Sequence, residues 1–213
     1  MFRVQGLSVA IGPVAIVRDA SLEVSERTMC GLIGRNGAGK TTLMRALMGA
    51  IAASGEAELD GVDLIGLPSH RRLAHGIGYM PEDRRLVPEF TVEDNIRLPS
   101  FTLATDGVEK RIAWIFALMP ELLKVRDRRA LELSGGQQKM VALARALMAG
   151  RRILLLDEPF EGLAPALASR LAAVLADLKS EGVSILIAES NQIHIADLLA
   201  HAYRIERGRV APA

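Results

Sequence analysis

A glycine-rich loop near the N-terminus constrains this chain more than any other part of its sequence. Residues 34–42 read Gly-Arg-Asn-Gly-Ala-Gly-Lys-Thr-Thr and fit the phosphate-loop pattern G-x-x-x-x-G-K-[ST]. The apolar run 29–33 predicts a buried strand before the loop, and apolar residues at helical spacing over 43–48 predict a helix behind it that ends at Gly49. A glycine-rich turn before an ordinary helix is the alternative, and the strand–loop–helix order favours a phosphate loop.

The residue types in this loop suit a nucleoside triphosphate. Glycines let successive backbone N–H groups point at one anion, and the start of a helix adds partial positive charge. Lys40 supplies a point charge for the β- and γ-phosphates, and the Thr41 hydroxyl can ligate Mg²⁺. The residues expected to bind the nucleotide are Gly34, Arg35, Asn36, Gly37, Ala38, Gly39, Lys40, Thr41 and Thr42.

The overall composition is that of an ordinary globular protein. The 213 residues are 50% hydrophobic and 24% charged, and a net charge of +1 gives no general attraction to nucleic acid. Four arginine pairs are dispersed, and most of them are expected on the solvated surface; they lie at 71–72, 84–85, 128–129 and 151–152. The single cysteine, Cys30, is expected to pack in the core of a protein from a reducing compartment. Neither a signal peptide nor a membrane span is visible, so we expect a cytoplasmic protein.

The order of strand-like and helix-like segments predicts an α/β fold. Strands are expected at 2–9, 22–24, 29–33, 77–80, 153–157 and 184–188, and turns at 60–61 and 207–208 predict hairpins. Helices are expected from Thr91 and over 108–119, 137–148 and 165–179. The helical stretch 88–149 therefore interrupts a core formed by 1–87 and 150–213, and the whole chain is predicted to be one domain.

Two carboxylates close the apolar run 153–156. Asp157 and Glu158 stand where a central parallel strand should end at a ligand crevice. Asp157 can hold Mg²⁺, directly or through water, and Glu158 can polarise the water that attacks the γ-phosphate. Two acids at a strand end can also be helix caps or solvated charges. Their combination with the phosphate loop favours the metal ligand and the base.

The hexapeptide Leu-Ser-Gly-Gly-Gln-Gln at 133–138, here called the signature segment, is the third distinctive feature. Ser134 can cap a helix that runs to Gly150, and the two glycines leave the first N–H groups of that helix bare. A plain helix cap is the alternative. The residues singled out here are Ser134, Gly135, Gly136 and Gln137.

These three segments occur in an order that resembles the nucleotide-binding subunits of ABC transporters over nearly the whole chain. The stretches Tyr-Met-Pro-Glu-Asp-Arg-Arg at 79–85 and Leu-Asp-Glu-Pro-Phe-Glu-Gly-Leu-Ala-Pro at 156–165 look more narrowly like the ATPase subunits of importers for branched-chain amino acids, amides and urea. The resemblance implies a P-loop NTPase of the ABC type, with a RecA-like core, an antiparallel β edge and an inserted helical subdomain.

The resemblance also implies roles and partners. Glu82 stands at the place of the family's Q-loop glutamine, which implies that it senses Mg²⁺ and the γ-phosphate; a surface acid paired with Arg84 or Arg85 is the alternative. The implied Mg²⁺ ligands are Thr41, Glu82 and Asp157. Two such subunits, identical or different, would meet head to tail with ATP between the phosphate loop of one and the signature segment of the other. Further implied partners are membrane permease subunits and, indirectly, a periplasmic solute-binding protein, at the inner face of the cell membrane. Nucleic acid is not an expected partner.

Three positions depart from the family pattern. Ile11 stands where an aromatic ring stacks on adenine, so base affinity should be lower by about 0.5–1.5 kcal/mol. Ser190 stands where a switch histidine contacts the γ-phosphate, and relatives often have Gln there. Ala164 stands in place of an aspartate that links the two sites. His194, one helical turn beyond Ser190, is a candidate substitute, with surface or helix packing as the alternative. Glu158 and Ser190 are the catalytic candidates.

The sequence thus predicts the ATP-hydrolysing subunit of an importer for branched-chain amino acids or related amides. Two alternatives remain: the same type of ATPase subunit with a different transported solute, and a nucleotide-gated binding or regulatory module with little hydrolysis. In a heterodimer, this chain's own site would turn over slowly while its signature segment completes the partner's site. A soluble ABC protein acting on DNA or ribosomes normally needs two cassettes or large insertions, and a single near-neutral cassette offers neither.

Overall fold

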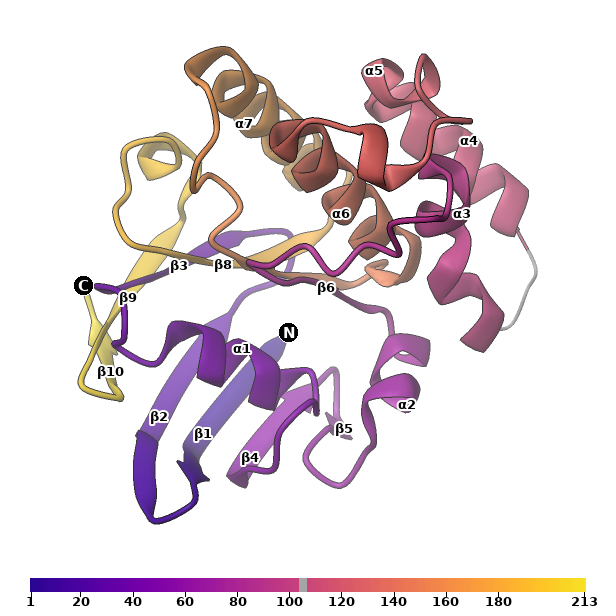
Figure 1. The fold of residues 1–213 in the computed structure, drawn as a ribbon. Coiled ribbons are helices and arrows are strands. Elements are labelled where there is room, and N and C mark those ends of the chain that lie inside the picture. The colour runs from indigo at the N-terminus through magenta and orange to yellow at the C-terminus, as the bar shows by residue number, and fades with distance from the viewer. Residues whose placement is uncertain (104–106) are drawn as a thin grey trace.

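The computed structural model of the protein describes residues 1–103 and 107–213 and contains two β-sheets (Figure 1). The smaller sheet is antiparallel, in the order β2-β1-β4-β5, and the larger sheet has the order β10-β9-β3-β8-β7-β6. The smaller sheet comprises β1 (Phe2–Ile11), β2 (Val14–Val24), β4 (Ser54–Leu59) and β5 (Val62–Asp63). The larger comprises β3 (Met29–Ile33), β6 (Ile77–Met80), β7 (Ile153–Asp157), β8 (Ser184–Glu189), β9 (His201–Glu206) and β10 (Arg209–Pro212).

The central strands of the larger sheet are buried on both faces. Strands β6, β7, β8, β3 and β9 pair in parallel, and only β10 folds back antiparallel. In β7, Leu154 and Leu156 pack into the hydrophobic core on one side of the sheet, and Ile153 and Leu155 pack into the core on the other. Burial on both sides explains why this strand reads as an uninterrupted apolar run.

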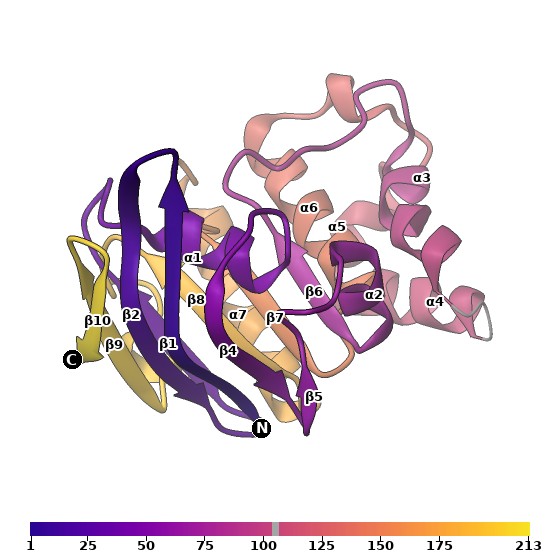
Figure 2. The ribbon, with the colours of Figure 1, turned by 90° about the horizontal axis from the view of Figure 1, so that it is seen from below.

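Helices fill the space on either side of the larger sheet. Helix α1 (Lys40–Leu47) lies between the two sheets, and α6 (Gly135–Ala149) and α7 (Pro165–Ser180) cover the opposite face of the larger sheet (Figures 1 and 2). The other helices are α2 (Ser69–Ala74), α3 (Val92–Arg97), α4 (Val108–Leu118) and α5 (Pro120–Leu123). Short 3₁₀ turns are η1 (Leu98–Thr102), η2 (Ala130–Glu132) and η3 (Ala196–Leu198).

The chain between β6 and β7 is helical, as predicted. In residues 81–103 and 107–152 the structure has helices and turns and, apart from an isolated bridge between Thr91 and Arg129, no strand. Helix α3 begins after Thr91, as expected, with a capping box in which the Thr91 hydroxyl accepts a hydrogen bond from the backbone N–H of Asp94 at 3.1 Å. The division of the chain into a nucleotide-binding core and a helical subdomain stays a prediction.

The second strand is longer than the sequence indicates. Residues 22–24 are only the end of β2, which begins at Val14 directly after the Gly12-Pro13 turn. The register between β1 and β2 shifts several times, and Asp19 adopts a φ of 52°. These irregularities break the period-two alternation by which a strand is recognised in sequence.

Arg72 is an exception to the expectation that most of the arginine pairs lie on the solvated surface. Its side chain is buried, with 3% of the residue exposed, whereas Arg71 is exposed. The Arg72 guanidinium donates to the carbonyl oxygens of Ala46 and Leu47, at 2.8 and 2.7 Å, at the end of α1. These oxygens need donors where a helix ends, and the desolvated guanidinium supplies them.

Two other expectations concern Cys30 and membrane spans. Cys30 is a buried free thiol, and burial raises its pKa to about 12, as expected of a residue that packs in the core. Within residues 1–103 and 107–213, no helix combines the length and the apolar character needed to cross a bilayer.

Candidate nucleotide site

The phosphate loop connects β3 to α1 and has the glycine-dependent shape that its sequence predicts. Gly37 and Gly39 have φ values of 79° and 110°, a region that residues with a Cβ rarely adopt. At Gly34 a Cβ would lie 2.4 Å from the carbonyl oxygen of Ile205, so β9 packs directly against the loop backbone. Gly39 caps α1 without any side-chain hydrogen bond, which leaves the N–H groups at the helix start available to an anion.

Lys40 is buried and turned onto its own loop. Its ammonium donates to the carbonyl oxygens of Gly34 and Arg35, at 2.6 and 3.2 Å, and forms an ion pair with Glu158 at 2.9 Å. The three N–H donors of the ammonium are therefore surrounded by oxygens, two from the loop backbone and one from Glu158. Any phosphate that Lys40 binds must compete with these oxygens.

The side chains of Thr41, Asp157 and Glu82 bring three oxygen donors together. The Thr41 hydroxyl lies 3.2 Å from Oδ1 of Asp157 and 3.4 Å from Oε2 of Glu82, although the three residues come from α1, β7 and the loop after β6. Hydroxyl and carboxylate oxygens are the donors that Mg²⁺ prefers, so this set fits the ion predicted from the sequence. The sequence alternative, in which Glu82 pairs with an arginine, is not what the described residues show: Arg85 pairs with Asp83 instead.

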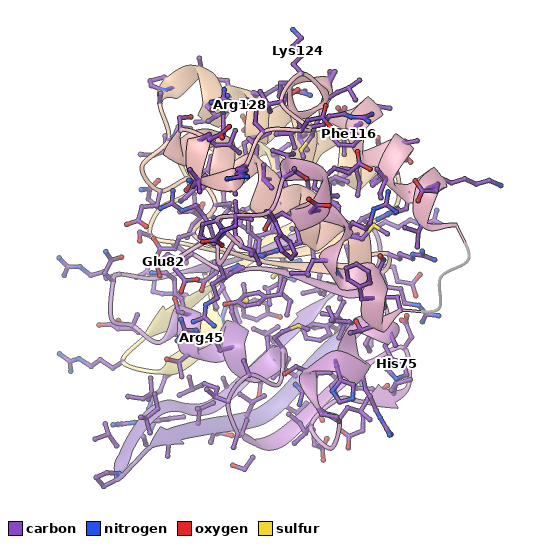
Figure 3. The ribbon with its side chains drawn as sticks, turned by 45° about the vertical axis from the view of Figure 1, so that its right-hand side comes forward. Arg45, His75, Glu82, Phe116, Lys124 and Arg128 are labelled. Atoms are coloured by element: carbon purple, nitrogen blue, oxygen red, sulfur yellow. The ribbon has the colours of Figure 1, made fainter. Side chains whose placement is uncertain are left out.

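Asp157 is held in an apolar environment that opposes its charge. Burial raises the pKa of Asp157 to about 6; the hydrogen bond from Thr41 opposes this shift, and the neighbouring Glu82 and Glu158 carboxylates add to it. The Tyr79 hydroxyl donates to the second carboxylate oxygen at 3.5 Å, so both oxygens of Asp157 have a hydrogen-bond donor. Glu82 is exposed at the edge of this group and lies beside Arg45 of α1 on the face drawn in Figure 3.

Glu158 follows β7 with an unusual backbone conformation. Its φ is 47°, a left-handed value that costs a non-glycine residue about 1–3 kcal/mol. The side chain is buried, and its carboxylate points to Lys40 and to the Ser190 hydroxyl, which is 3.3 Å from Oε2 and 3.4 Å from Oε1. A cavity of about 370 Å³ opens beside it, with Asn36, Phe160, Glu189, Ser190 and His194 among its lining residues.

Ser190 follows β8 and lies between the phosphate loop and Glu158. Its hydroxyl donates to Oδ1 of Asn36 at 2.8 Å and lies 3.5 Å from the Lys40 ammonium. A hydroxyl has one hydrogen and two lone pairs, so Ser190 can donate to Asn36 and accept from Lys40 at the same time. The structure thus brings Ser190 together with Lys40 and Glu158, and its role at the γ-phosphate stays a prediction.

The signature segment starts α6 as expected. The Ser134 hydroxyl accepts from the N–H of Gln137 at 3.3 Å, and the Gln137 side chain accepts from the Ser134 N–H at 3.0 Å, which completes a capping box. A Cβ at Gly136 would meet the Leu167 side chain at 2.3 Å, so α7 packs closely on this turn. The side-chain partner of Ser134 in the structure is within its own helix start, not in the phosphate loop.

The positions that depart from the family pattern lie at different places. Ile11 ends β1 opposite Val14 at the tip of the hairpin and is 57% exposed. Ala164 caps α7 and is exposed, without a side-chain hydrogen bond. The placement of His194 one helical turn beyond Ser190 is wrong, because residues 190–195 are not helical. The His194 ring instead stacks on Phe160, with ring centres 5.2 Å apart, since the turn folds back over the cavity.

Two buried charges at this site were not singled out from the sequence. Lys139 of α6 donates to the carbonyl oxygens of Glu158 and Glu161, at 2.8 and 2.5 Å, and Glu189 accepts from the N–H of Phe160 at 3.0 Å. Burial raises the pKa of Glu189 to about 7. In the sequence, each of these two residues is a charge next to apolar residues. That pattern predicts a buried charge but does not identify the backbone groups that it contacts.

Comparison with known proteins agrees with this geometry. Residues 17–161 match the family model described as ABC transporter. The high-affinity branched-chain amino acid transport ATP-binding protein BraG of Pseudomonas aeruginosa is 37% identical over 96% of this chain and 88% of its own length. The lipopolysaccharide export system ATP-binding protein LptB of Haemophilus influenzae is 33% identical over 92% of this chain and 82% of its own.

The fold also matches solved structures. The dimeric structure of a bacterial ABC transporter cassette superposes with a TM-score of 0.86 at 24% identity and covers 99% of this chain and 96% of that one. At this identity the superposition establishes the arrangement of strands and helices described above.

Proposed function

Because this chain belongs to the ABC transporter family and is an ATP-binding ATPase subunit, we propose that it powers the uptake of branched-chain amino acids or related amides. The carrying observation is that Lys40 of α1 and the consecutive residues Asp157 and Glu158 at the end of β7 are buried together, although they are far apart in the sequence. The similarity to BraG, whose name states branched-chain amino acid transport, supports the choice of solute.

The site residues have distinct tasks in hydrolysis. Lys40 leaves Glu158 and the loop carbonyls to bind the β- and γ-phosphates, which the N–H groups of the phosphate loop also hold. Thr41 and Asp157, with Glu82 at the edge, would hold Mg²⁺, which neutralises phosphate charge when bound.

Glu158, released from Lys40, orients the attacking water and accepts its proton. A general base of this kind contributes a factor of about 10²–10⁴ to the rate. Ser190 donates a hydrogen bond to the γ-phosphate from the position where it now meets Asn36 and Lys40. The exposed Ile11 lies beside the adenine and holds it less firmly than an aromatic ring would.

A second ATPase subunit completes the site. The start of α6 is a capped helix N-terminus with two glycines, which suits it to contact a phosphate held by another subunit. We assign this role to Ser134, Gly135, Gly136 and Gln137. The core 1–87 and 150–213 then binds nucleotide, and 88–149 carries the signature segment to the partner. The assembly sits on permease subunits at the inner face of the membrane, with a periplasmic solute-binding protein on the far side.

Two alternatives have specific support. Similarity to LptB favours an ATPase subunit of the same kind that serves a different transported solute. Ile11 and Ser190 favour a nucleotide-gated module with little hydrolysis, since both positions give weaker contacts than an aromatic ring or a histidine would.

The test combines hydrolysis with transport. Phosphate release by the purified chain with Mg-ATP is compared with that of Glu158→Gln, and the chain is then reconstituted in vesicles with the permease subunits that co-purify with it. Leucine, isoleucine, valine and short amides are supplied with the solute-binding protein of the same assembly. Turnover that one of these solutes stimulates supports the proposal. Stimulation by lipopolysaccharide alone, or ATP binding without turnover in the complete assembly, supports the corresponding alternative.

A further inference from the structure

The backbone of Glu158 is held in its left-handed conformation by contacts from two directions. From the larger sheet, the carbonyl oxygen of Ala188 accepts the Glu158 N–H at 2.9 Å, and the Glu189 carboxylate accepts the N–H of Phe160 at 3.0 Å. From the helical side, the ammonium of Lys139 binds the carbonyl oxygens of Glu158 and Glu161. The turn 158–161 is therefore fixed at its two ends by one lysine.

Lys139 is a buried ammonium near the carboxylates of Glu158, Glu161 and Glu189. It is only 7% exposed, and desolvation lowers its pKa. Its side-chain hydrogen bonds go to the backbone of the turn, with N–O distances of 2.8 and 2.5 Å. Burying an ammonium is costly unless strong acceptors compensate. The geometry thus places the charge where it fixes a backbone conformation that is unfavourable by itself.

Lys139 lies on the same helix as the signature segment. Ser134 caps α6, and Lys139 follows five residues later, about 7.5 Å along the helix axis. A helix moves as a rigid unit over such a distance, so a displacement of its start reaches the ammonium and, through it, the carbonyl of Glu158. Rotation about the Glu158 backbone redirects the carboxylate relative to Lys40 and Ser190.

We propose that Lys139 is a positioning residue that couples the placement of the signature helix α6 to the orientation of the Glu158 carboxylate in the same chain. This inference rests on the proposed function, in which the start of α6 contacts a nucleotide held by the second subunit. Engagement of the signature segment at one site thereby aligns the general base at the other. Ala164 offers no side-chain hydrogen bond at the start of α7, whereas Lys139 contributes two to the Glu158 turn.

The test uses variants of Lys139 with a matched control. Lys139→Met keeps the length of the side chain and removes its donors, whereas Lys139→Arg keeps charge and donors. Lys179→Met is the control, because Lys179 of α7 also donates to a backbone carbonyl, that of Leu198 at 3.2 Å, away from the site. Turnover and KM for Mg-ATP are measured in the assembled transporter, and affinity for ADP in the purified chain.

We expect Lys139→Met to lower kcat at least about tenfold while the Kd for ADP changes less than threefold, because the phosphate loop is untouched. Lys139→Arg should keep at least about a third of kcat, and Lys179→Met should stay within about twofold of wild type. A loss of ADP affinity equal to the loss of kcat, or an unchanged kcat, would overturn the proposal. If Lys139→Met does not fold, Lys139→Leu, which also lacks a donor, takes its place under the same criteria.

A double-mutant cycle with Ser134→Ala tests the coupling itself. If Lys139 transmits the engagement of Ser134, the Ser134 change lowers kcat in wild type but adds little in the Lys139→Met background. Fold losses that multiply would show two independent effects and overturn the coupling. A wild-type chain without ATP binding or turnover in the full assembly would overturn the proposed function and this inference together, whereas active wild type with an unaffected Lys139→Met overturns this inference alone.

Discussion

The ammonium of Lys40 and the carboxylate of Glu158 form an ion pair of 2.9 Å in which both side chains are more than nine-tenths buried. One residue is proposed to bind the nucleotide phosphates and the other to activate water, and here each neutralises the other. Nucleotide binding must therefore break this pair, and the freed carboxylate then repels the γ-phosphate until water lies between them. The pair links the binding step to the readiness of the base.

Glu158→Gln should abolish turnover while strengthening nucleotide binding. Phosphate release should fall at least about 100-fold because the general base is lost. ATP affinity should rise about 3- to 10-fold, because Lys40 loses its charged partner and a negative charge next to the γ-phosphate is removed. Phosphate release and equilibrium binding of labelled ATP measure the two effects. Retained turnover would exclude Glu158 as the base.

The buried Glu189 should make the protein less stable as the pH rises. Its folded pKa of about 7 lies above its ordinary value of 4.5, so the folded state binds more protons between these values. The free energy of unfolding should therefore fall as the pH rises from about 4.5 to 7. Glu189→Gln keeps an acceptor for the Phe160 N–H and should be more stable than wild type at pH 8, by about 1–3 kcal/mol.

Urea unfolding at pH 5.5, 7 and 8.5 checks this expectation. The exposed Glu206, changed to Gln, is the matched control and should leave the pH dependence as it is. If Glu189→Gln and wild type show the same slope, the Glu189 carboxylate does not carry this titration.

Ile11→Tyr should improve nucleotide binding. An aromatic ring at the hairpin tip can stack on the adenine, which is expected to lower the KM for ATP about 2- to 10-fold. Val14→Tyr is the control, because Val14 pairs with Ile11 across the hairpin and is equally exposed. An equal gain from both variants would point to general surface binding and not to stacking at residue 11.

Arg72→Met should destabilise the fold by about 2–4 kcal/mol. The change leaves the carbonyl oxygens of Ala46 and Leu47 without the guanidinium donors at the end of α1. Arg71→Met, at the exposed neighbour, should stay within about 0.5 kcal/mol of wild type. The free energy of unfolding in urea measures both, and equal effects would mean that the buried hydrogen bonds contribute nothing net.

Ser134→Arg should reduce transport more than Ser190→Ala. An arginine at the start of α6 obstructs the contact with the second subunit's nucleotide, whereas loss of the Ser190 hydroxyl leaves Lys40 and Asn36 in place. Solute uptake into vesicles by the reconstituted transporter compares them. A larger loss of uptake in Ser190→Ala than in Ser134→Arg would contradict the hypothesis that this chain's own site hydrolyses ATP slowly while its signature segment completes the partner's site.

The sequence by itself determined the local elements and the type of site. The strand–loop–helix at 29–48, the capped helix starts at Thr91 and Ser134, and the hairpin turns at 60–61 and 207–208 follow from short-range rules, and the structure confirms them. The family resemblance also follows from contiguous motifs. Local steric and hydrogen-bonding preferences are sufficient for these features because each lies within a few residues.

The tertiary structure alone decided which distant groups meet. Most arginine pairs were expected at the surface, yet Arg72 is buried and donates to the carbonyl oxygens at the end of α1, a helix 25 positions earlier in the sequence. Lys139 contacts the Glu158 turn from 19 positions away in the sequence, and Glu189 contacts it from 29 positions away. Helical and strand periodicities show which residues are buried but not which partners they find there, since that depends on long-range packing.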